Sequence, residues 1–173
     1  MATRFFLQLG DITSMNVEAI VNSSDMTLLD GGPVHSAIHG AAGPGLKEEC
    51  KALHGCPVGE ARITAGHKLG ACYIIHTVAP TWNWGSAVEE QALAGCYRNS
   101  LKLAASHNIR SLAFPSIGSG RQPQIPLERA AHIAISTILE FLNTNIQPEK
   151  VVLVCFDAPT FQAYQRALKE ALP

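Results

Sequence analysis

Short apolar runs alternate with longer amphipathic stretches along most of this chain. Runs of four to six mostly apolar residues, bounded by glycine, proline, aspartate or asparagine, are typical of β-strands. In the longest amphipathic stretch, Leu93, Tyr97 and Leu101 recur at helical spacing. The pattern predicts strands at residues 4–9, 19–22, 61–65, 73–78, 111–114 and 151–156, and helices at 34–42, 46–53, 89–107, 126–141 and 159–172.

Strands that alternate with helices indicate an α/β fold with a largely parallel sheet. Several of the predicted strands are apolar almost throughout, as expected when helices cover both faces of the sheet. In such sheets, ligands bind beyond the carboxyl ends of the strands. The loops in which to look for a site are therefore residues 10–13, 22–33, 115–126 and 156–159.

A chain of 173 residues fits one domain, residues 1–173, and is long enough to bury a stable core. Its 47% hydrophobic content excludes intrinsic disorder, and 13 Lys and Arg against 14 Asp and Glu exclude the basic field of a nucleic-acid binder. We find no apolar run of the ~20 residues that span a membrane and no signal-peptide pattern at the start. Five cysteines without a CxxC pair are expected to be reduced, so we expect a cytoplasmic protein.

Two of the loops carry glycines just before a predicted helix. The first contains Gly31 and Gly32, and the second contains Gly118, Ser119 and Gly120. Backbone amides beside glycine can approach an anion at a helix N-terminus, where the helix dipole also favours it. Each glycine pair alone is compatible with an ordinary turn, but two such loops at one sheet edge suggest a clamp for a diphosphate.

Asp11 and Phe156 follow the first and last predicted strands. The Asp11 carboxylate could accept a hydrogen bond from an exocyclic amine such as that of adenine, or it could cap a local turn. The Phe156 ring could stack on a base, or it could be an ordinary core aromatic. Both alternatives stay open at this point.

His35 and His39 are four residues apart on a predicted helix, which is a possible metal-ligand spacing. No HExxH motif and no third ligand accompany them, so we expect no metal ion. His76 lies inside an apolar strand and is expected to be a hydrogen-bonded core histidine. Trp82 and Trp84 follow that strand and could cover a pocket or form a surface loop.

The chain resembles the macrodomain family over almost its whole length. The resembling stretches are GDIT at 10–13, EAIVN at 18–22, the glycine-containing segment 31–46, CPVGEARIT at 56–64, IIHTVAP at 74–80, YRNSLKLA at 97–104, LAFPSI at 112–117 and VCFD at 154–157. The likeness is strongest to bacterial O-acetyl-ADP-ribose deacetylases and mono-ADP-ribosyl hydrolases. It implies a three-layer α/β/α sandwich around a mixed six-stranded sheet, with ADP-ribose or a derivative as ligand and no cofactor.

The resemblance also implies an adenosine subsite and two phosphate loops. It places Asp11 at the adenine amine, Ile12 beside it and Phe156 against the adenosine end. Asn22 keeps the first asparagine of the family's Asn-Ala-Ala-Asn signature. The residues at phosphate-loop positions are Gly31, Gly32 and Val34 in the first loop, and Ser116, Gly118, Ser119 and Gly120 in the second.

The distal half of the implied site departs from the family pattern. Asp25 replaces the second asparagine of the signature, His35 replaces the aspartate of active members, and Pro33 replaces a loop glycine and removes its N–H. Asp25 adds a negative charge near the diphosphate: at ~8 Å and an effective dielectric of ~20 the repulsion is about 2 kcal/mol, or about thirtyfold in affinity. Arg121 could offset this charge by bonding a phosphate, or it could be a solvated loop residue.

Three functions remain open from the sequence. The first is a module that binds ADP-ribose, free or attached to a protein, without turnover. The second is a hydrolase of O-acetyl-ADP-ribose or of mono-ADP-ribosylated protein, with His35 as general base beside Asp25. The third is a diverged domain for another nucleotide. We expect neither a nucleic-acid nor a membrane partner.

Overall fold

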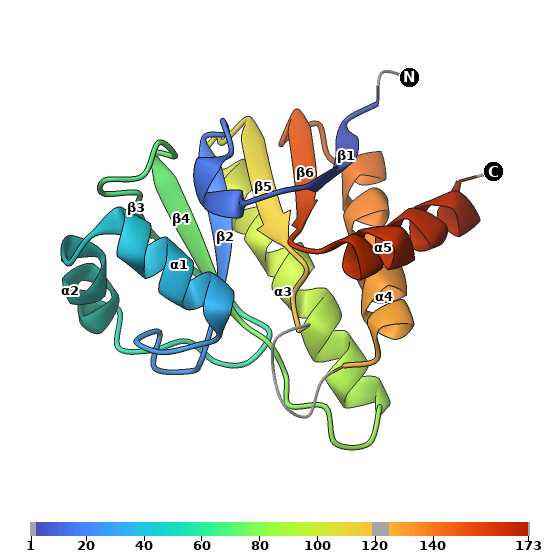
Figure 1. Ribbon diagram of the computed structural model, residues 1–173, viewed down its shortest axis with the longest axis horizontal. Coiled ribbons are helices and arrows are strands. Elements are labelled where there is room, and N and C mark those ends of the chain that lie inside the picture. The colour runs from blue at the N-terminus through green and yellow to red at the C-terminus, as the bar shows by residue number, and fades with distance from the viewer. Residues whose placement is uncertain (1–2, 119–124, 173) are drawn as a thin grey trace.

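The computed structural model describes residues 3–118 and 125–172. Its strands form one sheet in the order β1-β6-β5-β2-β4-β3 (Figure 1). The ladders between neighbours are parallel except for the one between β3 and β4, so the sheet is mixed. The strands are β1 (Phe5–Leu9), β2 (Ala19–Ser24), β3 (Ala61–Ala65), β4 (Tyr73–Val78), β5 (Ser111–Pro115) and β6 (Lys150–Cys155).

Helices cover both faces of this sheet. Figure 1 shows α1 and α2 in front of the sheet and α3 and α4 behind it, while α5 packs against α4 and β1. The helices are α1 (Pro33–Ala42), α2 (Gly45–Ala52), α3 (Ala87–Ser106), α4 (Leu127–Thr144) and α5 (Ala158–Ala171). The result is the three-layer α/β/α sandwich around a mixed six-stranded sheet that the resemblance implied.

Alternate residues of the central strands supply two separate cores. Ile20 of β2 and Ile74 of β4 belong to the core under α1 and α2, whereas the adjacent Val21 and Ile75 belong to the core under α3, α4 and α5. This is the two-residue period of side chains along a strand. It explains why these strands read as continuous apolar runs: both of their faces are buried.

Local sequence determines where the helices begin. Pro33 occupies the first turn of α1, directly after the N-cap Gly32, where its missing N–H costs no hydrogen bond. Ser86 and Glu89 form a capping box at the start of α3. The Asp157 carboxylate accepts a hydrogen bond from the Thr160 amide at 2.8 Å and so caps α5.

The six predicted strands and five predicted helices are all present; β3 and β4 have the predicted bounds, and the other boundaries shift by at most three residues. Two features were not predicted: β2 continues to Ser24, and a short 3₁₀ helix, η1 (Ile12–Ser14), follows β1. In the described part of the chain, none of the helices combines the length and hydropathy needed to cross a membrane.

The sheet divides where β2 and β5 end. The ladder between these strands contains only the pairs Ala19–Leu112 and Ile20–Ala113, whereas the ladder from β2 to β4 continues to Ser24–Val78. The chain leaves β2 toward α1 on one face and leaves β5 toward α4 on the other. Adjacent strands that continue to opposite faces create a crevice at their carboxyl ends, which is where ligands bind in open α/β sheets.

Candidate functional site

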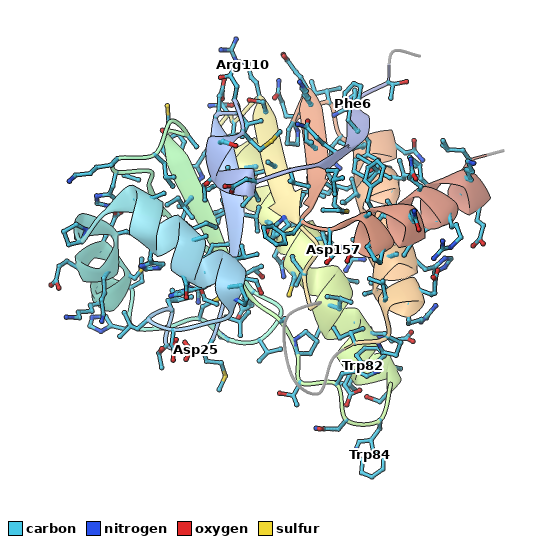
Figure 2. All side chains as sticks on the ribbon, viewed as in Figure 1. Phe6, Asp25, Trp82, Trp84, Arg110 and Asp157 are labelled. Atoms are coloured by element: carbon cyan, nitrogen blue, oxygen red, sulfur yellow. The ribbon has the colours of Figure 1, made fainter. Side chains whose placement is uncertain are left out.

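The loop from β2 to α1 forms one wall of this crevice and is tied down by its own backbone. The Asp25 amide donates to the Asp30 carbonyl at 2.9 Å, and the Asp25 carboxylate accepts from both the amide and the hydroxyl of Thr27, at 3.0 and 2.5 Å. The Cys56 amide donates to the Met26 carbonyl, which joins the loop to its neighbour. In Figure 2, Asp25 lies below α1, at the edge of the molecule.

The predicted residues of the first phosphate loop lie together at the start of α1. Gly31 is exposed, and Gly32 and Val34 are half-buried. A Cβ atom on Gly31 would lie 2.7 Å from the His35 Cβ, so the loop rests directly on His35 and this position admits no larger residue without movement. Pro33 supplies no amide, so any anion bound here would rely on the amides around it.

The second loop begins from a rigid stem. Tyr97 is fully buried, and its hydroxyl accepts a hydrogen bond from the Ile117 amide at 3.0 Å. Gly118 has a φ of +91°, a backbone conformation that residues other than glycine rarely adopt. Ser116 precedes this stem and is half-buried. The predicted site residues Ser119, Gly120 and Arg121 lie outside the described residues.

The predicted adenosine end is open. Phe156 is 82% exposed, so its interpretation as a core aromatic is wrong and its ring is free to stack. Its neighbour Asp157 lies at the amino end of α5 (Figure 2). The Asp11 carboxylate caps η1 by accepting from the amide and hydroxyl of Thr13, at 2.9 and 2.7 Å. The cap is thus confirmed, and contact of Asp11 with an adenine amine stays a prediction. The Ile12 side chain is buried.

A buried polar cluster lies beneath the first phosphate loop. Asn22 is fully buried, and its Nδ2 lies 3.0 Å from Ser24 Oγ, 3.2 Å from His76 Nδ1 and 3.3 Å from His35 Nδ1. Ser24 Oγ in turn lies 3.0 Å from His35 Nδ1. On the far side, His76 Nε2 lies 2.9 Å from Thr64 Oγ1. The expectation that His76 is a hydrogen-bonded core histidine is confirmed.

His39 completes this cluster by stacking on His35, with ring centroids 4.1 Å apart and an interplanar angle of 25°. Burial lowers the pKa of all three histidines, to about 4 for His39 and about 3 for His76. For His35 the carboxylates of Asp30 and Asp25 and a hydrogen bond with the Leu29 backbone oppose this effect without reversing it. The imidazoles are therefore neutral at pH 7.

Asp25 and His35, the two predicted catalytic residues, belong to the same region but do not form an ion pair among the described residues. Oδ1 of the Asp25 carboxylate accepts both hydrogen bonds from Thr27, and His35 is 5% exposed. Within residues 3–118 and 125–172, no three His, Cys, Asp or Glu side chains are arranged to hold a metal ion.

The sequence did not single out Ser24 and Thr64, which complete the buried cluster. Both lie on the same strand faces as a recognised polar residue: Ser24 is two residues after Asn22, and Thr64 pairs across the ladder with Ile74, two residues from His76. Two-residue alternation of polar side chains in an otherwise apolar strand could have revealed them.

The two tryptophans lie in different environments: Trp82 packs against the core, and Trp84 is 90% exposed and projects outward (Figure 2).

Comparison with known proteins gives the same assignment throughout. Residues 21–134 match the Macro domain family. A macro domain-containing protein of Methanosarcina mazei is 52% identical over 163 residues, which cover 94% of this chain and 87% of that protein. An O-acetyl-ADP-ribose deacetylase of Klebsiella pneumoniae is 46% identical over 172 residues, covering 97% and 98%.

Solved structures of the Oceanobacillus iheyensis macrodomain have the same fold. One contains ADP (TM-score 0.89) and one, a point mutant, contains ADPR (TM-score 0.91); each is 39% identical and covers 95% of this chain and 90% or 91% of that chain. The fold, the family match and these identities agree. The chain belongs to the macrodomain family.

Proposed function

We propose that this protein binds ADP-ribose, free or attached to a protein, in the crevice at the carboxyl ends of β2 and β5. The observation that carries the proposal is the division of the sheet after Ile20 and Ala113, with two glycine-containing loops at its mouth. The relatives solved with ADP and ADPR support the same ligand class.

The adenosine moiety would lie at the Asp11 and Phe156 end of the crevice, and the diphosphate between the loops at Gly31–Gly32 and Ser116–Gly120. Phe156 supports this placement because a largely exposed aromatic ring at a strand end costs solvation unless it has a partner. Val34 and Asn22 would support the first loop from below.

We propose binding with little or no turnover. A general base needs a free nitrogen within reach of the attacking water. Here His35 is 5% exposed with its Nδ1 against Ser24, and no ion pair joins it to Asp25 among the described residues. In this geometry His35 and Asp25 do not face a ligand as a catalytic pair.

Hydrolysis is the second candidate, and one observation favours it: the deacetylase of Klebsiella pneumoniae matches this chain over nearly its full length. Under this alternative, O-acetyl-ADP-ribose or a mono-ADP-ribosylated protein would be the substrate. His35 and Asp25 would have to rearrange when the substrate binds. A diverged domain for another nucleotide is the third.

Calorimetric titration with ADP-ribose, ADP and AMP tests the proposal. We expect micromolar binding of ADP-ribose that exceeds binding of ADP, because the distal ribose adds contacts in the crevice. Incubation with O-acetyl-ADP-ribose, followed by chromatography, then tests turnover: no release of acetate above the buffer rate is expected. Absence of ADP-ribose binding in folded protein would contradict the proposal.

We also propose a cytoplasmic location. All five cysteines are free, and four of them are buried, which fits a reducing compartment.

A further inference from the structure

His35 occupies the position at which active relatives were expected to carry an aspartate, and its surroundings indicate what it does instead. Its ring lies directly under Gly31 and is clamped from the side by His39. Its Nδ1 faces Ser24 Oγ at 3.0 Å and Asn22 Nδ2 at 3.3 Å. A neutral imidazole carries one N–H and one acceptor nitrogen, so its role depends on which nitrogen holds the proton.

The proton arrangement can be followed from the far end of the cluster. The Ala65 carbonyl, 3.2 Å from Thr64 Oγ1, can only accept, and we assign it the single proton of the Thr64 hydroxyl. Thr64 Oγ1 then accepts from His76 Nε2 at 2.9 Å, with Cys50 Sγ a weaker partner of the same nitrogen at 3.9 Å. His76 therefore carries its proton on Nε2, and its Nδ1 accepts from the Asn22 amide at 3.2 Å. This fixes the orientation of the Asn22 side chain, with Nδ2 toward both histidines.

The reverse orientation of the Asn22 amide is less favourable. As placed, Oδ1 is buried and has no hydrogen-bond partner among the described residues. Reversal would put the NH₂ group, with two donors, in that position and leave two N–H groups unpaired instead of one acceptor. An unpaired buried donor costs a full desolvation penalty, so the observed orientation is the better one.

Asn22 has one further proton to give after it has bonded His76. The shorter of its two remaining contacts is with Ser24 Oγ, at 3.0 Å against 3.3 Å for His35. With that proton accepted, the Ser24 hydroxyl donates its own proton to His35 Nδ1. Because Nδ1 accepts this proton, the His35 proton of the neutral imidazole is then on Nε2.

We propose that Ser24, oriented by Asn22, is a positioning residue that holds His35 as the neutral Nε2–H tautomer. In this tautomer the imidazole supports the Gly31–Gly32 loop and does not act as a general base. Nδ1 is then used within the protein, by Ser24. The loop lies directly against His35, because the space between Gly31 and the His35 side chain is too small for even a Cβ atom. Only the effect on affinity rests on the proposed function; the tautomer does not.

Two-dimensional ¹H–¹⁵N NMR of the imidazole nitrogens tests the proposal in the full chain, with His35→Gln used to assign the signals. We expect His35 to show an unprotonated Nδ1 and a protonated Nε2 throughout pH 6 to 8. A wild-type His35 with its proton on Nδ1, or with both nitrogens protonated at pH 7, would overturn the proposal without any variant.

Ser24→Ala removes the donor to Nδ1, and Ser23→Ala is the matched control because Ser23 is the adjacent residue on the opposite face of β2. We expect Ser24→Ala alone to shift the His35 nitrogen signals. We also expect it to weaken ADP-ribose about fivefold, the equivalent of one hydrogen bond, while AMP binding is unchanged. Unchanged His35 signals in folded Ser24→Ala would contradict the role of Ser24. A wild type that binds no ADP-ribose would refute the proposed function and leave the tautomer test standing.

Discussion

The two ends of the crevice are built in opposite ways. At the end where we propose that adenosine binds, Phe156 and Asp11 are exposed to solvent. At the distal end, Asn22, Ser24 and His35 are at most 5% exposed and bond to one another. Side chains that face solvent are available to a ligand, whereas side chains that satisfy one another contribute to the fold. The difference supports the proposal that the protein binds a ligand with little or no turnover.

The largest effect should come from the closed end. His76→Ala removes a fully buried ring and leaves the Asn22 amide and the Thr64 hydroxyl without their partner. We expect a loss of about 3 kcal/mol in the free energy of unfolding, measured by urea denaturation. His132→Ala, at an exposed position of α4, is the control and should change stability little. A His76→Ala variant as stable as wild type would break the comparison at once.

The next largest effect should come from the negative charge of Asp25, at the mouth of the distal end. Asp25→Asn removes one negative charge but keeps an oxygen that can accept from Thr27, so the loop should retain its shape. We expect ADP-ribose to bind about thirtyfold more tightly at low salt, with less gain as salt screens the charge. Calorimetry at two salt concentrations measures this.

Glu140→Gln provides the control for Asp25→Asn, because it removes the same charge from an exposed position on α4. If both variants bind ADP-ribose as the wild type does, Asp25 does not lie near the diphosphate. If both bind more tightly by the same factor, the effect is one of net charge and not of position.

The open end should govern affinity for the base. Phe156→Ala removes a ring that is 82% exposed, so stability should hardly change. Loss of one base–aromatic stack should weaken ADP-ribose and AMP alike, by about tenfold. Trp84→Ala removes another largely exposed aromatic, from a different loop, and should leave both affinities unaltered. Weaker binding of ADP-ribose without weaker binding of AMP would place Phe156 away from the adenosine.

The fold could be predicted well from the sequence because buried apolar segments recur along the chain. The first half of β2, β5 and β6 are mostly apolar on both faces, and this property can be recognised from the local sequence. The buried cluster was harder to foresee, since Asn22, Thr64 and His76 come from three strands and meet only through the register of β2 with β4 and of β4 with β3. Exposure of Phe156 could not be inferred either, because an aromatic at a strand end is compatible with both environments.

A dependence of stability on pH again separates the two ends. Burial lowers the pKa of His39 to about 4 and that of His76 to about 3, with further lowering by the neighbouring histidines and, for His39, by Lys47. In the unfolded chain both titrate near 6.5. Below that pH the unfolded chain binds protons that the folded chain refuses, so acid favours unfolding.

The stability contributed by the neutral histidines should therefore be complete above pH 6.5 and decline as pH falls toward 4 for His39 and toward 3 for His76. Urea midpoints at pH 7.5, 6.5, 5.5 and 5.0 should be level at first and then decrease. His39→Gln removes one of the titrating groups and should flatten the decrease, whereas His107→Gln, at the exposed end of α3, should preserve it. Midpoints that stay constant down to pH 5 would mean that the histidines beneath the phosphate loop are reached by solvent, and the distal end would then be as open as the adenosine end.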